Sequence, residues 1–197
     1  MPNAPFKRHR QSTGNGCALV VCDSRLEEHF QIHETIYAAL GHFGLPYRVH
    51  DLASGDLDAR TLEACAVVVI GQDNVGLGLT RNSQSVLLQA VSGGLGLVNF
   101  DYNLAQYDSS FAEAMGLSGR HASRSIDVGS ADSIAVPAAD HWLTWTQDEG
   151  QEHRLNMPVP AALAKANRRK ARILAETDSG SPAVVSGRLG KGRIVQW

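Results

Sequence analysis

Apolar runs alternate with amphipathic segments along the first hundred residues. Four strands are predicted, at residues 17–24, 46–52, 66–74 and 95–100. The first is a continuous apolar run that ends in Asp23 and Ser24, as is typical of a strand buried on both faces of a parallel sheet. Between these strands, the spacing of apolar residues predicts helices at 26–43 and 80–94 and a helical turn at 57–65. Gly44, with Pro46 just beyond it, suits the end of the first helix. This alternation predicts an α/β fold with a doubly wound, mainly parallel sheet.

The second half of the chain has a less regular pattern. We expect a short helix at 109–117, one or two strands within 121–137, and a polar, aromatic connection at 141–160. Three further strands are predicted, at residues 172–177, 182–189 and 192–197. A tight turn at Gly190 and Gly192 joins the last two, so the chain should close with a hairpin.

Composition narrows the class of protein. The 197 residues suit one domain over 17–197, either complete or part of a longer protein, preceded by a flexible arm at 1–16. A net charge of -2 gives no reason to expect nucleic acid or a membrane as a partner, and no apolar run is long enough to span a bilayer. The three cysteines lie in or beside apolar runs, which favours reduced, buried thiols and a cytoplasmic setting.

Polar side chains follow three of the predicted strands. Asp23, the segment 72–74 and the segment 99–103 should meet at the carboxyl edge of the sheet, where ligands bind in open α/β folds. The alternative interpretation is that these side chains only cap the helices that follow. His141 and Trp142 could cover such a cleft, because an aromatic face beside carboxylates suits a polyol. The predicted ligand-binding residues are Asp23, Gln72, Asp73, Asn99, Asp101, Tyr102, His141 and Trp142.

Other motifs indicate no metal or cofactor. His29 and His33 stand four residues apart on the first predicted helix, but no third zinc ligand follows at a suitable spacing, so solvated histidines are favoured. The glycines around Lys191 lack the spacing and the hydroxyl residue of a phosphate-binding loop. The basic run at 167–172 is typical of a solvated loop.

Several segments together resemble the class I glutamine amidotransferase-like superfamily, and most closely its ThuA-like (trehalose-utilisation) branch and related domains of carbohydrate-active proteins. The resemblance covers residues 17–197 and rests on the segments ALVVCDS, AVVVIGQDN, GGLGLVNFDYN, PAADHWLTW with the later Asp148-Glu149, and GKGRIVQW. It implies a flavodoxin-like α/β fold.

The resemblance also implies where a catalytic thiol would stand. In the amidotransferases the fourth strand delivers a cysteine on a sharp turn, and a histidine and a glutamate follow the last strand. Here the matching turn reads Asn99-Phe100-Asp101-Tyr102, and the sequence ends at Trp197. Without a thiol or hydroxyl at the turn, no acyl intermediate can form there, so glutaminase activity is not expected. ThuA-like proteins tend to have a histidine near this turn, where this chain has Asp101.

Two functions remain open from the sequence. The first is a non-catalytic, amidotransferase-like domain that binds a small ligand, such as a carbohydrate, or serves as an assembly module, as a homo-oligomer or beside other domains of a longer chain. The second is a sugar-acting enzyme of hydrolase or isomerase type, in which Asp101 works with His141 or Glu149 as proton-transfer partner.

Overall fold

The computed structural model describes residues 16–119, 126–137, 140–144 and 146–197. The strands are β1 (Cys17–Cys22), β2 (Tyr47–Asp51), β3 (Cys65–Ile70), β4 (Gly96–Asn99), β5 (Leu117–Gly119), β6 (Asp127–Ala135), β7 (Glu152–Ala166), β8 (Ala171–Thr177), β9 (Pro182–Leu189) and β10 (Gly192–Gln196). The helical segments are η1 (Glu27–Phe30), η2 (His33–Tyr37), α1 (Ala38–His42), α2 (Ala59–Leu62), η3 (Val75–Leu77), α3 (Arg81–Gly93), η4 (Leu104–Gln106) and α4 (Ser109–Ala114). The predicted arm, except residue 16, lies outside the described residues, as do the start of the segment 121–137 and part of PAADHWLTW.

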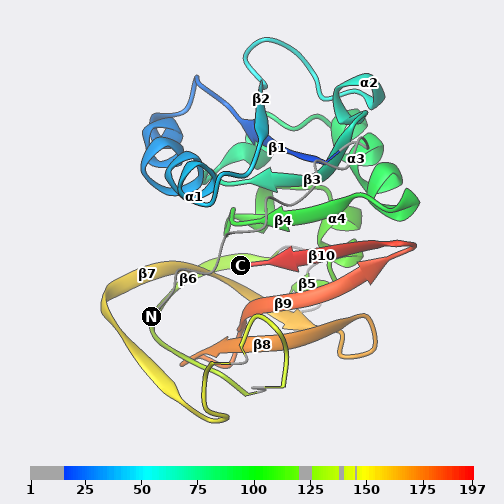
Figure 1. The fold of residues 1–197 in the computed structure, drawn as a ribbon. Helices are drawn as coiled ribbons and strands as arrows, with labels where there is room; N and C mark the ends of the chain where they lie inside the picture. The colour runs from blue at the N-terminus through cyan, green and yellow to red at the C-terminus, as the bar shows by residue number, and fades with distance from the viewer. Residues whose placement is uncertain (1–15, 120–125, 138–139, 145) are drawn as a thin grey trace, which may run out of the picture.

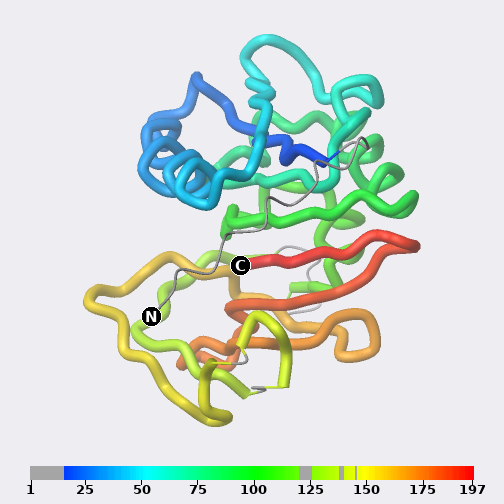
Figure 2. Tube along the Cα trace, in the orientation of Figure 1, coloured from blue at the N-terminus to red at the C-terminus, as the bar shows by residue number. Residues whose placement is uncertain are grey.

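The strands form one mixed sheet in the order β2-β1-β3-β4-β10-β9-β8-β6-β7-β5 (Figure 1). Strands β2, β1, β3, β4 and β10 are paired in parallel. From β10 onward every pairing is antiparallel. The α/β class is therefore confirmed, with a parallel N-terminal half and an antiparallel C-terminal half; only β10 returns to join the parallel strands, as the path of the chain in Figure 2 shows.

Alternate residues of β1 pack into two different apolar clusters. Val20 and Cys22 contact Ile32, which precedes η2, whereas Leu19 belongs to the main core cluster together with Leu87 of α3. Since successive side chains of a strand point to opposite faces, helical segments lie over both faces of the sheet at β1. This burial on both sides explains the continuous apolar run that the sequence shows there.

Two parts of the predicted arrangement need correction. The expected connection at 141–160 contains the first half of β7, the longest strand (Glu152–Ala166). Most of β7 is exposed or half-buried, so its sequence lacks the apolar run that marks a buried strand. It also contains Pro158 and Pro160, which argue against a strand in the sequence pattern. The helix expected at 26–43 is broken into η1, η2 and α1, of 3-10, π and α type.

The predicted C-terminal hairpin is present and packs closely on α3. Strands β9 and β10 pair antiparallel from Leu189 and Gly192, across a turn in which Gly190 has φ of 58°. A Cβ atom on Gly192 would collide with the carbonyl oxygens of Val91 and Leu95, so only glycine permits this approach. In the described part of the chain, none of the helices has the length and apolar character needed to cross a membrane.

Candidate functional site

The turn after β4 presents a fully buried carboxylate, that of Asp101. It accepts hydrogen bonds from the backbone N–H groups of Asn74 (3.1 Å), Gly76 (3.2 Å) and Asn103 (2.9 Å), and from the hydroxyl of Tyr107 (2.8 Å). Burial raises the pKa of Asp101, and the four donors oppose this by stabilising the ionised carboxylate. Asp101 thus joins the loops that follow β3 and β4.

Gln72 and Asp23 connect the ends of β3 and β1 in the same way. The Gln72 side chain accepts a hydrogen bond from the backbone N–H of Asp23 and donates one to its carbonyl oxygen, both at 3.0 Å. The Asp23 carboxylate binds the guanidinium of Arg25 at 2.6 and 2.7 Å, which holds the pKa of Asp23 below its ordinary value. Both side chains are therefore used within the protein.

Asn99 connects β4 to β10. Its side-chain amide donates to the Gln196 side-chain oxygen at 2.8 Å and its oxygen accepts from the backbone N–H of Asp101 at 3.1 Å. The Gln196 amide in turn donates to the Asp101 carbonyl oxygen at 3.2 Å. These buried groups satisfy one another, as buried polar groups must to avoid a large free-energy cost.

The predicted strand-end residues therefore meet, as expected, at one edge of the sheet. None of them is the N-cap of the helical segment that follows it, although Asp101 accepts from the Gly76 N–H in the first turn of η3. The side chains that cap helix N-termini are Asp58 for α2, Thr80 for α3 and Asp108 for α4. Asp23, Gln72, Asn99 and Asp101 instead bond strand-end loops to one another.

A cavity of about 450 Å³ lies beside this network, and we call it the strand-end cavity. Its polar lining comes from Asp73, Tyr102, Gln196 and Thr177, and Trp197 and Phe100 contribute aromatic rings. The remaining lining residues come from the loop after β4 and from β5, β6, β7 and β9: Leu104, Leu117, Ala131, Ile134, Leu155, Val159, Pro160, Ala161, Ala162, Pro182, Ala183 and Val184. Figure 1 shows β6 and β7 on the side toward which β4 and β10 point. The volume is that of an ordinary small-molecule site.

Asp73 contributes a carboxyl group to the lining of this cavity. It is half-buried, and no residue that the structure describes gives it a hydrogen bond or an ion pair. Burial, together with the nearby carboxylates of Asp101 and Glu28, raises the pKa of Asp73 to about 6. Burial and the charge of Asp73 also raise the pKa of Tyr102. Asp73 and Tyr102 are thus close, and both are free to meet a ligand.

A smaller cavity of about 270 Å³ has Ile134, Val184 and Trp197 as lining residues in common with the strand-end cavity. Its polar end is formed by Gln147 and His153, whose side chains lie 2.9 Å apart in a hydrogen bond. Trp197 therefore lines both cavities.

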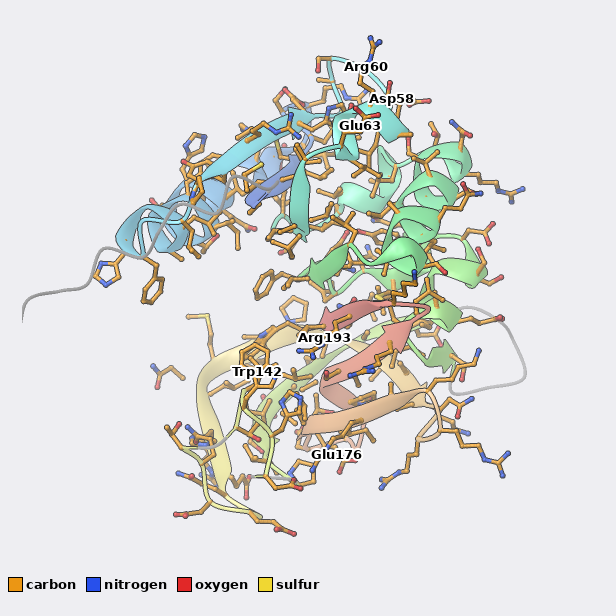
Figure 3. The ribbon with its side chains drawn as sticks, turned by 45° about the vertical axis from the view of Figure 1, so that its right-hand side comes forward. Asp58, Arg60, Glu63, Trp142, Glu176 and Arg193 are labelled. Atoms are coloured by element: carbon orange, nitrogen blue, oxygen red, sulfur yellow. The ribbon has the colours of Figure 1, made fainter. Side chains whose placement is uncertain are left out.

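His141 and Trp142 lie in a different place from the one expected. They line a groove of about 690 Å³ over β8, β9 and β10, which we call the cationic groove; its other lining residues are Arg168, Arg169, Lys170, Ala171, Arg172, Ser186, Gly187, Arg188 and Arg193. Figure 3 shows Trp142 beside Arg193. The basic run at 167–172 thus forms a turn and the start of β8, with Arg172 paired to Asp140.

The three residues of the predicted catalytic set are not brought together. Asp101 is enclosed in the buried network, His141 lines the cationic groove, and Glu149 is exposed in the loop before β7. Proton transfer between them would need a shared atom within hydrogen-bond reach, which this placement does not offer.

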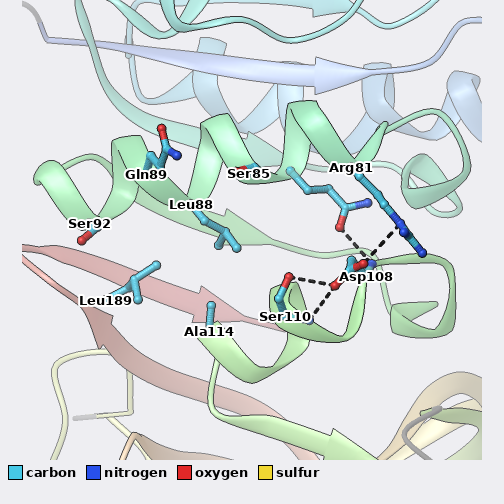
Figure 4. A pocket seen from close by; sticks show the side chains of 10 residues that line it. Arg81, Ser85, Leu88, Gln89, Ser92, Asp108, Ser110, Ala114 and Leu189 are labelled. Carbon is cyan, nitrogen blue, oxygen red and sulfur yellow. Dashed lines mark hydrogen bonds and ion pairs between the residues drawn. The ribbon is translucent and has the colours of Figure 1, made fainter.

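A further groove, between α3 and α4, has its polar groups paired internally. Arg81 lies 3.4 Å from Asp108, and the Asp108 backbone N–H donates to Gln84 at 2.9 Å (Figure 4). Asp108 also accepts from Ser110. We interpret this groove as the seam between two helices.

No cysteine stands at the β4 turn. Cys17 and Cys65 begin β1 and β3 at the opposite edge of the sheet, and Cys22 ends β1, buried against Ile32. His29 and His33 contact each other with ring centroids 5.5 Å apart, and the described residues contain no group of three or more candidate metal ligands.

Gln196, Trp197 and the lining residues from β6, β7 and β9 are not among the ligand-binding residues predicted from the sequence. Gln196 and Trp197 do follow an apolar run, like the other strand-end residues. The signal was therefore present, but only the parallel pairing of β10 with β4 brings these two residues to the same edge.

No family model and no curated protein sequence matches the chain. Its fold is similar to that of a ThuA-like protein from Bacteroides uniformis, with a TM-score of 0.67 and 12% identity over 100% of this chain and 84% of that one. The fold is also similar to part of a β-galactosidase from Bacillus circulans sp. alkalophilus, with a TM-score of 0.60 and 15% identity; the match covers 91% of this chain but 28% of the enzyme. For a glutamine amidotransferase from Thermotoga maritima the TM-score is 0.51 and the identity 11%; the match covers 91% of this chain and 74% of that one. The resemblance to ThuA-like proteins and glutamine amidotransferases is thus confirmed for the fold.

Proposed function

We propose that this protein is a ThuA-like domain without a thiol nucleophile that binds a small neutral carbohydrate in the strand-end cavity. The observation that carries the proposal is the lining of that cavity, in which Asp73 and Tyr102 lie among mainly apolar residues and the ring of Trp197. The helices on both faces of β1 further support a doubly wound arrangement of the parallel half.

The chemistry of this lining matches a sugar. A carboxylate, a phenol and the Gln196 amide offer hydrogen bonds to hydroxyl groups, and an aromatic ring can pack against the C–H face of a pyranose. A fully anionic ligand would be repelled by Asp73 and by the nearby Glu28 and Asp101. The similarity in fold to a β-galactosidase adds support for a galactose-containing ligand, although that enzyme is a much longer chain.

A ligand-observed NMR screen tests the proposal. We expect saturation transfer from the wild-type protein to at least one galactoside or mannoside, and loss of the signal when the same saccharide is added to the Trp197→Ala variant. Absence of saturation transfer from the folded wild-type protein to every neutral saccharide tested would contradict the proposal.

The pKa of Asp73 favours a second candidate, a sugar-acting enzyme. A carboxyl group with a pKa of about 6 is partly protonated near neutral pH and suits a general acid. Asp73 would then take the role that the sequence assigned to Asp101.

Release of nitrophenol from nitrophenyl galactosides and mannosides separates the two candidates. The binding proposal predicts no release above buffer. Release that falls as pH rises through about 6 and disappears in Asp73→Asn would establish the enzyme.

A further inference from the structure

Two half-buried thiols face each other at the amino-terminal edge of the parallel strands, far from the strand-end cavity. Cys17 begins β1 and Cys65 begins β3, and the two residues are direct partners in the parallel ladder. Their Sγ atoms lie 4.0 Å apart. The sequence predicts reduced, buried thiols; Cys22 is buried, whereas Cys17 and Cys65 are only half-buried.

The pairing of Cys17 with Cys65 is compatible with the Cα separation of a disulfide. Adjacent strands lie about 4.8 Å apart, within the Cα separation of roughly 4.4–6.8 Å that a disulfide spans. Rotation of the two side chains would have to shorten the Sγ separation from 4.0 Å to a bond of about 2.05 Å. The register of the β1–β3 ladder shifts between Cys17 and Ala18. The backbone movement needed to bring the two sulfurs together would therefore fall in a part of the sheet where the ladder is already irregular.

A fixed cation stands beside one of the two thiols. Arg48 Nη2 lies 2.9 Å from the Cys65 Sγ atom. The same nitrogen donates to the carbonyl oxygens of Thr61 (3.1 Å) and Glu63 (2.8 Å), which holds the guanidinium in place. A neighbouring cation stabilises the thiolate, the nucleophilic form of cysteine. Burial has the opposite effect and raises the pKa of Cys65, so its reactivity should increase steeply above neutral pH.

We propose that Cys17 and Cys65 are a reversible oxidation site, at which hydrogen peroxide converts the two thiols into an intramolecular disulfide. The Cys65 thiolate attacks one peroxide oxygen, the O–O bond breaks, and Cys65 becomes a sulfenic acid while the released hydroxide takes up a proton to form water. The Cys17 sulfur then attacks the Cys65 sulfur, the S–O bond breaks, and the leaving hydroxyl departs as water with the Cys17 proton. The two sulfurs lose two electrons in total, and peroxide gains them. A thiol reductant reverses the reaction.

Counting free thiols by intact mass tests the proposal. The full chain is treated with hydrogen peroxide at about pH 8.5, near the ordinary cysteine pKa, unfolded, alkylated with N-ethylmaleimide and weighed. Of its three cysteines, we expect all to be alkylated before peroxide and a single one, Cys22, afterwards, with dithiothreitol restoring the original count. Non-reducing peptide mapping of the wild-type protein should show the Cys17 and Cys65 peptides linked, which requires no variant to fold.

Substitutions identify the participants. Cys22→Ser should keep the cross-link, whereas Cys17→Ser and Cys65→Ser should each prevent it. Arg48→Gln should give the same product several-fold more slowly, and Arg60→Gln, on the nearby exposed α2 (Figure 3), should leave the rate unchanged. The cross-link closes a loop from residue 17 to residue 65, so oxidation should raise the melting temperature by roughly 5–10 °C.

Three results would overturn the proposal: full alkylation after peroxide, oxidation to sulfinic acid without a cross-link, or a disulfide that joins two copies of the chain. Phenylarsine oxide, which bridges two adjacent thiols, provides an independent probe of the wild-type protein. One equivalent should bind and block the oxidation, and failure to bind would show that the thiols do not meet.

Discussion

Asp73 and Asp101 follow neighbouring strands but have opposite surroundings. Asp101 accepts four hydrogen bonds in a fully buried position, and Asp73 has none from any residue that the structure describes. The sequence predicts that both lie at the carboxyl edge of the sheet. It could not tell them apart, because the difference depends on where the loops that contain Gly76 and Tyr107 place their donors.

The raised pKa of Asp73 makes the stability of the protein depend on pH. Because the folded-state pKa is about 6 and the ordinary value 3.8, the folded protein binds more protons than the unfolded chain between these values. The free energy of unfolding contributed by this group therefore falls as pH rises from about 4 to about 6. Asp73→Asn should be more stable than wild type above pH 6, by about 1 kcal/mol after allowance for solvent screening, and equal to it below about pH 4. Urea unfolding of both proteins across this pH range measures the difference in stability; a difference that does not change with pH would contradict the prediction.

The substitution Asp101→Asn should change the free energy of unfolding in the opposite direction from Asp73→Asn. An asparagine there would place an amide N–H group against backbone N–H donors and leave at least one of them unpaired. We expect Asp101→Asn to lower the free energy of unfolding by about 2–3 kcal/mol at neutral pH. Asp73→Asn is the matched control in the same urea measurements. An Asp101→Asn protein as stable as wild type would show that the buried network contributes little.

At the scale of elements, the sequence predicts best where burial is greatest. Strands β1, β3 and β4 and helix α3 agree with the sequence analysis because each has the apolar pattern that burial requires. Strand β7 was not predicted because most of its residues are exposed or half-buried. Its pairing with β6 therefore does not require the apolar sequence pattern by which strands are recognised. The broken helix at 26–43 has three types of turn, which the spacing of apolar residues does not distinguish.

The hairpin of β9 and β10 provides a test at this scale. Gly192 lies against the end of α3, where an added Cβ would meet backbone carbonyl oxygens that cannot move aside cheaply. Gly192→Ala should lower the free energy of unfolding by about 2–3 kcal/mol. Gly93→Ala, at the end of α3 with open space around it, should leave stability unchanged or slightly higher, measured by thermal unfolding. Equal effects of the two substitutions would mean that the close approach is not required.

For the whole molecule, the decisive feature is the position of β10. This strand pairs in parallel with β4 and antiparallel with β9, so it joins the two halves of the sheet. The arrangement brings Gln196 and Trp197 into the lining of the same cavity as Asp73 and Tyr102, together with residues of β6 and β7. Sequence patterns define each strand but not the order of the strands. For this reason the edge that contains the site was predictable and the cavity itself was not.

Calorimetric titration with a saccharide tests the central claim most directly. Galactose- and mannose-containing saccharides are titrated into the wild type, Trp197→Ala in the strand-end cavity, and Trp142→Ala in the cationic groove as the matched control. We predict saturable binding of at least one saccharide by the wild type and by Trp142→Ala, and binding at least about tenfold weaker by Trp197→Ala, a difference of about 1.4 kcal/mol. Binding that is lost with Trp142 and kept with Trp197, or no binding by the folded wild type, would contradict the account.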